Sequence, residues 1–95
     1  MAWKTVQEIR DALADINDPA VDRLDIEVRP DSTGEPAVFV TVVFRDADLR
    51  EGWLRRNDLR ASIRARLVEF VPEIWPFVWF SAQTVAANPY AARAR

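Results

Sequence analysis

The fold is decided by one stretch of the chain, residues 37–45, which reads AVFVTVVFR. In a β-strand its side chains alternate between two faces, because neighbouring residues point to opposite sides of the sheet. One face then carries three valines and a phenylalanine, and the other carries Phe39, Thr41 and Val43. Because both faces are mostly apolar, we predict a central strand that is covered on both sides. The sequence leaves open which face meets the helices.

The segment before this strand predicts its partner. Residues 24–28 alternate apolar with charged side chains, which is the pattern of a strand with one buried and one wet face. Residues 30–36, PDSTGEP, are turn formers with a proline at each end. We therefore predict an antiparallel hairpin in which residues 30–36 connect the two strands.

A first helix is expected near the N-terminus. Thr5 followed by Glu8 forms a capping box, in which each side chain accepts a hydrogen bond from the backbone of the other residue. Apolar side chains then recur at a spacing of three and four, the pattern of one buried helix face. Residues 17–19, Asn-Asp-Pro, end this helix, since a proline forces the residue before it out of the helical region.

A second long helix follows the central strand. Asn57 or Asp58 is its expected cap, and Pro72 stops it. A short helical turn, capped by Asp46 or Asp48, is an additional element in one of the two orders that we consider.

The last strand, residues 74–83, is aromatic. It carries Trp75, Phe77 and Trp79 on one face. Pro76 has no N–H group, which places the segment at an edge of the sheet or its first residues outside the ladder.

These elements predict an α+β fold in the order αββαβ, or αββααβ if the turn before residue 55 is helical. Two helices pack on one face of a three-stranded mixed sheet, because the passage between the last two strands is long enough for a parallel crossover. Residues 1–83 form a single domain, and residues 84–95 are expected to be a loose C-terminal tail.

Composition excludes several classes of function. The chain has 95 residues, enough for one core, and contains neither histidine nor cysteine. Thiolate nucleophiles, imidazole bases and zinc sites built on those ligands are therefore excluded. Asp46 and Asp48 have the spacing of a Mg²⁺-binding carboxylate pair, but we favour helix capping because no phosphate-binding loop precedes them. We assign no catalytic residue, no metal ligand and no cofactor, and we do not expect an enzyme.

The location expected from the sequence is the cytoplasm. The N-terminal residues MAWKT do not begin a signal segment, and the longest apolar runs are too short to span a bilayer. No membrane partner is expected.

Two helices on one face of a three-stranded sheet leave the other face without cover. An apolar area of that size in water usually marks a partner surface. The candidate dimer or partner residues on this face are Phe39, Val43, Trp75, Phe77 and Trp79. We expect a non-catalytic protein-interaction module that is homodimeric through this apolar face, or that binds a small protein partner. The alternative is that the C-terminal segment of the chain folds back and covers the face.

The arginines suggest an alternative. Residues 1–48 hold eleven acidic and five basic side chains, whereas residues 49–95 hold four acidic and eight basic ones. A continuous helix would display arginines four residues apart as one stripe able to follow phosphates, although a solvated helix face has the same pattern. The candidate nucleic-acid contacts, on the surface from Arg50 to Arg66, are Arg55, Arg56, Arg60 and Arg64.

The order αββααβ resembles that of the type II K-homology domains, which bind RNA. Those domains hold the nucleic-acid backbone with a Gly-x-x-Gly loop between their two middle helices. Here the corresponding stretch is Gly52-Trp53-Leu54-Arg55, in which arginine stands in place of the second glycine. The resemblance covers the element order over most of the chain and implies nucleic-acid binding as the alternative function.

Overall fold

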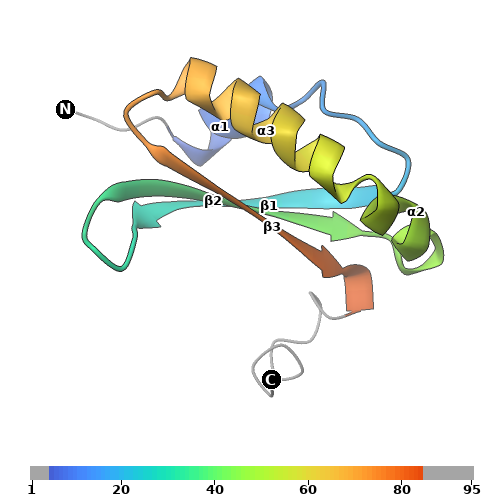
Figure 1. Ribbon diagram of the computed structural model, residues 1–95. Coiled ribbons are helices and arrows are strands. Elements are labelled where there is room, and N and C mark those ends of the chain that lie inside the picture. The colour runs from blue at the N-terminus through green and yellow to red at the C-terminus, as the bar shows by residue number, and fades with distance from the viewer. Residues whose placement is uncertain (1–4, 85–95) are drawn as a thin grey trace.

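The computed structural model describes residues 5–84, and Figure 1 shows how they are arranged. Along the chain the elements follow the order helix, strand, strand, helix, helix, strand, with a 3₁₀ turn before the second helix. This confirms the α+β class and the longer of the two predicted orders, αββααβ. The predicted C-terminal tail lies outside the described residues, apart from Thr84.

The sheet has three strands in the spatial order β1-β2-β3. β1 spans Val21–Pro30, β2 spans Pro36–Phe44 and β3 spans Trp75–Ala82. β1 and β2 are antiparallel and form the predicted hairpin, whereas β2 and β3 are parallel and need the predicted crossover. β2 is therefore the central strand, as its sequence predicts.

One carboxylate holds the hairpin turn. Asp31 accepts hydrogen bonds from the backbone N–H of Thr33 at 2.8 Å and of Glu35 at 3.1 Å, and from the Thr33 hydroxyl at 2.7 Å. Gly34 has a φ of 86°, a left-handed conformation that glycine adopts without steric cost. The turn therefore forms from the residue types that predicted it.

Helix α1, Val6–Ala12, starts at the predicted capping box. Thr5 Oγ1 accepts a hydrogen bond from the Glu8 N–H at 3.1 Å, and Glu8 Oε1 accepts one from the Thr5 N–H at 3.0 Å. Ile9 is fully buried, so the predicted apolar face of this helix enters the core.

The prediction that this first helix continues to residues 17–19 is wrong, because residues 13–15 already form turns. Asp15 in this segment pairs with Arg66, and Arg66 also donates a hydrogen bond to the carbonyl oxygen of Ala12 at 3.3 Å. Arg66 belongs to the later helix at Arg56–Phe70, so the last residue of α1 and the turn after it are bonded to a different helix. The chain leaves the helical conformation at that point.

The crossover between β2 and β3 contains a 3₁₀ turn at Asp46–Asp48, helix α2 at Leu49–Leu54 and helix α3 at Arg56–Phe70. Only one residue separates the two helices. The element expected as a short helical turn is therefore a 3₁₀ turn that runs directly into a helix.

Asn57 and Asp58 do not cap α3, contrary to the prediction. The helix has already started before them, and its N-cap residue, Arg55, makes no side-chain capping bond. The Arg55 N–H bonds to the carbonyl of Glu51 at 3.2 Å, and the Arg55 carbonyl accepts from the N–H of Leu59 at 3.0 Å. The backbone of α2 thus leads directly into α3, and no capping side chain is needed.

The core lies between the helices and one face of the sheet. Figure 1 shows α1 and α3 on the same side of the three strands. The side chains of β2 in this core are at most 1% exposed, and they are Val38, Val40, Val42 and Phe44. The buried side chains from α1, the turn after it and α3 are Ile9, Leu13, Leu59, Ile63 and Leu67. The valine face of β2 is therefore the one that meets the helices, which the sequence had left open.

Gly52 allows α2 to lie directly against the core ring of Phe44. A Cβ atom at this position would stand 2.7 Å from both Cε1 and Cγ of Phe44, which is closer than van der Waals contact permits. The Phe44 ring stacks on Phe80 of β3 with centroids 5.6 Å apart and cannot easily withdraw. The close approach of helix and ring therefore requires glycine.

We predict that Gly52→Ala destabilises the fold by about 1–3 kcal/mol, the usual cost of overpacking a filled site. In an exposed helix position the same change would stabilise the protein by up to about 1 kcal/mol, so the sign of the effect tests the contact. Urea unfolding followed by tryptophan fluorescence measures it. Ala61→Gly, at an exposed position of α3, controls for helix propensity alone. A Gly52→Ala protein as stable as the parent would contradict the close approach.

Candidate functional site

The sheet face away from the helices carries the aromatic residues expected on it. Trp75, Phe77 and Trp79 of β3 lie in one line, which we call the aromatic row. The strand register sets Phe77 beside Phe39 of β2 and Trp79 beside Thr41. Figure 1 shows no helix or strand of residues 5–84 over this face.

The aromatic rings on this face pack against one another. Phe39 and Phe77 stack with centroids 4.9 Å apart and planes 7° from parallel. Trp79 meets Phe39 edge-on at 5.8 Å. The guanidinium of Arg29 on β1 lies 3.8 Å from the centre of the Phe39 ring. Ring stacking and the cation–π contact hold the face in one arrangement.

The five predicted face residues differ in exposure. Trp75 and Trp79 are each 56% exposed, and Phe77 is half-buried. Phe39 is 9% exposed because Phe77, Trp79 and Arg29 pack against its ring, and Val43 is fully buried. The aromatic row, and above all its tryptophans, is therefore the part of the face that a partner could touch.

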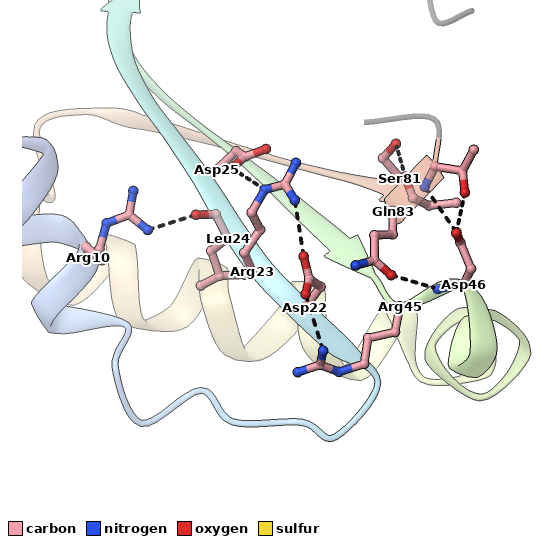
Figure 2. A network of polar contacts seen from close by, with 11 residues as sticks. Arg10, Asp22, Arg23, Leu24, Asp25, Arg45, Asp46, Ser81 and Gln83 are labelled. Carbon is pink, nitrogen blue, oxygen red and sulfur yellow. Dashed lines mark hydrogen bonds and ion pairs between the residues drawn. The ribbon is translucent and has the colours of Figure 1, made fainter. Parts of the chain in front are cut away.

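β1 borders the aromatic face with ion-paired side chains. Arg23 bridges Asp22 at 3.1 Å and Asp25 at 3.0 Å, and Arg45 reaches Asp22 at 3.3 Å, as Figure 2 shows. Exposed pairs of this kind add little to stability. Their main effect is to make this side of the sheet polar while the β3 side remains apolar.

Arg55, a candidate nucleic-acid contact, is engaged within the fold. Its Nε and Nη2 atoms donate to the two carboxylate oxygens of Asp18 at 2.8 and 2.7 Å, and the Asp18 side chain is 13% exposed. The hydrogen bonds from Arg55 hold the pKa of the Asp18 carboxyl below its usual range. This bidentate pair ties the segment after α1 to the junction of α2 and α3.

The other three candidate arginines lie four residues apart on α3. The predicted cap at residue 57 or 58 would have left Arg56 outside the helix, but α3 starts at Arg56 and contains all three. Arg56 lies 4.6 Å from the centre of the Trp53 ring, and Arg60 lies 5.1 Å from that of Phe80. None of the three, Arg64 included, forms an ion pair with a carboxylate of residues 5–84. Their charge is therefore available to a partner.

A groove of about 710 Å³ lies between α2 and β3. We call it the α2 groove; its apolar lining consists of Leu49, Trp53, Leu54, Phe80 and Ala82. The sequence analysis did not predict it, because helix and strand are far apart along the chain. The spacing of four between Leu49 and Trp53 is the signal that indicates an apolar face on this short helix.

Asp46 joins the start of the crossover to the end of β3. Its carboxylate accepts hydrogen bonds from the hydroxyl and, at 3.1 Å, the backbone N–H of Thr84, which lower the pKa of Asp46. Its own N–H donates to Gln83 Oε1 at 3.4 Å (Figure 2). Asp48 occupies the N-cap position of α2, as one of the two alternatives predicts, but its side chain makes no capping bond. Asp46 is not a cap, because the N-cap residue of the 3₁₀ turn is Arg45. Residues 5–84 hold no group of three or more potential metal ligands.

Comparison of the chain with known protein families, curated proteins and solved structures found no match. The resemblance to type II K-homology domains is thus one of element order. Gly52 lies inside α2 rather than in a loop between the middle helices. Among the described helices, none combines the length and the apolar character required to cross a membrane.

We predict that Asp18→Asn lowers the melting temperature at pH 7, because it takes the anionic acceptor from Arg55. The pKa of Asp18 is lower in the folded than in the unfolded chain, so the pair stabilises the fold above about pH 4. This contribution is lost as the pH falls through the lowered pKa of Asp18. The difference in melting temperature between the parent and Asp18→Asn should therefore become smaller in that pH range. Calorimetry across this pH range measures the difference, with Asp58→Asn as an exposed control. A difference that stays constant with pH would contradict the assignment.

Proposed function

We propose that this protein is a non-catalytic interaction module that binds a second copy of itself through the aromatic row. The observation that carries the proposal is the 56% exposure of both Trp75 and Trp79 on a sheet face without a covering helix in residues 5–84. Trp79 is already held by its contact with Phe39, so little side-chain freedom is lost when a partner covers it.

The exposed indoles supply enough apolar area to favour association. A tryptophan presents up to about 250 Å² of side-chain surface, so two that are 56% exposed leave on the order of 250 Å² in water. At about 25 cal/mol per Å², burial of this area gains about 6 kcal/mol for each copy. Association costs from about 4 kcal/mol upward, which two such contributions can offset.

A second copy of the chain is the simplest partner, because it requires no surface other than the apolar face already described. In a two-fold interface the same patch serves both subunits, so a single apolar face is sufficient. A small protein with an apolar face of its own would satisfy the same chemistry. A chain without histidine or cysteine suits a role without catalysis, and we place it in the reducing cytoplasm.

We predict that Trp79→Ser raises the dimer dissociation constant by about tenfold or more, because about 1.4 kcal/mol of lost burial is sufficient for that change. Size-exclusion chromatography with light scattering over a range of concentrations measures it. Val6→Ser removes a partly exposed apolar side chain from α1 and should leave the constant unchanged. Either a parent chain that is monomeric throughout or a Trp79→Ser variant that dimerises equally well would refute the proposal.

Nucleic-acid binding is a second candidate function, favoured by the unpaired arginines of α3. Arg56 and Arg60 lie over Trp53 and Phe80, so cationic and aromatic groups adjoin at the α2 groove. Single-stranded nucleic acid is bound by this combination of phosphate contacts and ring stacking. Arg55 is excluded from the contact because Asp18 holds it.

For this candidate we predict that a labelled single-stranded RNA binds at low salt and dissociates as the salt concentration rises. Replacing Arg56 and Arg60 together by glutamine should weaken binding and reduce the salt slope by about two, one for each phosphate that the variant no longer neutralises. Fluorescence anisotropy measures both quantities. Arg29→Gln, on the sheet face, is the control. Equal weakening by Arg29→Gln, or no binding by the parent, would remove this candidate.

A further inference from the structure

The two edges of the sheet are built differently. On β1 charged side chains alternate along the strand, and Arg10 donates a hydrogen bond to the carbonyl oxygen of Leu24 at 2.9 Å. Charges and covered backbone groups keep an edge strand from pairing with another chain. β3 contains no charged residue, and no strand of residues 5–84 pairs with its outer edge. Pro76 has no N–H group, so it removes one hydrogen bond from any ladder that forms at this edge. The edge with less protection against strand pairing is therefore that of β3.

Apolar side chains are exposed near both ends of this edge. At the C-terminal end of β3 lies the α2 groove, where Leu54 is 74% and Trp53 is 48% exposed. At the N-terminal end a second hollow, of about 510 Å³, brings Val68 of α3 near Trp75; Val68 is 55% exposed. We call it the α3 hollow. A bare strand edge between two apolar depressions has the features of a strand-addition site.

The two depressions carry opposite charge. Arg50 and Asp46 both line the α2 groove, and the guanidinium groups of Arg56 and Arg60 lie over its Trp53 and Phe80 rings, so basic groups outnumber acidic ones there. The α3 hollow has an excess of carboxylates, since its charged lining residues are Asp31, Glu35, Glu73 and Arg64. One end of the β3 edge is therefore basic and the other is acidic.

We infer that two copies of this chain pair through β3, strand against strand and antiparallel, about a two-fold axis. Such an axis reverses one strand relative to the other, so the α2 groove of each copy meets the α3 hollow of the other. The basic and apolar groups of each α2 groove then face the acidic and apolar groups of the partner's α3 hollow, and the two-fold axis creates this contact twice. This pairing rests on the proposed self-association and specifies its geometry: two three-stranded sheets become one continuous sheet.

Side-chain chemistry selects the register. Directly opposed residues of antiparallel strands lie on the same face of the sheet. When Phe77 lies on the axis, it opposes the partner's Phe77, and Trp75 opposes the partner's Trp79. All members of both aromatic rows then form cross-strand aromatic pairs, which stabilise sheets. Shifting the axis to Trp79 would set Phe77 against serine and would remove most of these pairs.

The same register aligns the charges. It brings the turn at residues 72–74, which contains Glu73, toward the partner's Ser81, and Ser81 lines the α2 groove together with Arg50. Stacking the two sheets face to face would cover the aromatic rows but would leave Trp53 and Leu54 in water. Edge pairing places the aromatic rows side by side, without covering their outer faces, and also brings the partner against Trp53 and Leu54. We favour it because it gives contacts at both surfaces.

A single introduced cysteine tests this pairing in a chain that has none of its own. Phe77→Cys places two thiols on the axis with their Cα atoms about 4.5–5.5 Å apart, which a disulfide can span. Sheets stacked face to face lie about 10 Å apart, beyond the limit of about 7 Å for a disulfide. We expect most of the Phe77→Cys protein to run as a covalent dimer on a non-reducing gel after mild oxidation. Val6→Cys on α1 is the control and should stay monomeric on the gel.

A charge exchange tests the same pairing without touching the aromatic row. Arg50 and Glu73 are both exposed, so their substitution should leave the fold intact. Arg50→Glu and Glu73→Arg should each raise the dimer dissociation constant, by about tenfold if each costs about 1.4 kcal/mol. The double exchange should restore most of the affinity, because attraction returns with the signs reversed.

The outcomes separate this pairing from the proposed function. Cross-linking of Phe77→Cys well above Val6→Cys, with rescue in the double exchange, supports antiparallel pairing of β3. A parent chain that is monomeric in light scattering refutes both the pairing and the proposed function. A dimeric parent without selective cross-linking and without rescue refutes the pairing alone, and the proposed self-association stands.

Discussion

The structure depends on β2 being apolar on both faces. Paired with β1 on one edge and β3 on the other, the strand can occupy only the centre of the sheet. The helices bury its valine face and so form the core. On the opposite face Phe39 and Val43 are buried, but the indoles of Trp75 and Trp79 on β3 are more than half exposed. Within residues 5–84 one layer of helices serves a sheet with two apolar faces, and the unburied remainder lies on β3.

The same strand also positions α2. Phe44 is the last residue of β2, and its ring stacks on Phe80 of β3. The backbone of α2 can lie against the Phe44 ring because residue 52 is glycine and has no Cβ atom. Without a Cβ at this point α2 comes close to the end of β3, which creates the α2 groove. The glycine that in sequence resembles part of a nucleic-acid-binding loop thus has a packing role.

Features whose causes lie within a few residues of sequence could be predicted. The capping box at Thr5, the hairpin, the parallel crossover and the placement of the aromatic row on one face are of this kind. Features set by distant residues could not. Asp18, the partner of Arg55, is 37 residues away, and Arg66, which bonds to Asp15 just after α1, is 51 residues from it. The sequence did not predict which face of β2 meets the helices, because both faces are apolar. It did not predict the α2 groove either, because that groove is formed jointly by a helix and a strand that are far apart in the chain.

The division of charge along the chain determines which arginines remain for a partner. The first half is acidic and the second basic, and the pairs Asp15–Arg66 and Asp18–Arg55 join one half to the other. These pairs occupy two arginines and leave those beside the α2 groove. The acidic end of a second copy and the phosphates of a nucleic acid are complementary to this same surface. Two ligands that neutralise one surface oppose each other's binding by equal free energies. The proposed pairing through β3 and the proposed nucleic-acid binding would therefore compete for the α2 groove, and we expect a dimer formed in this way to bind nucleic acid more weakly than its monomer.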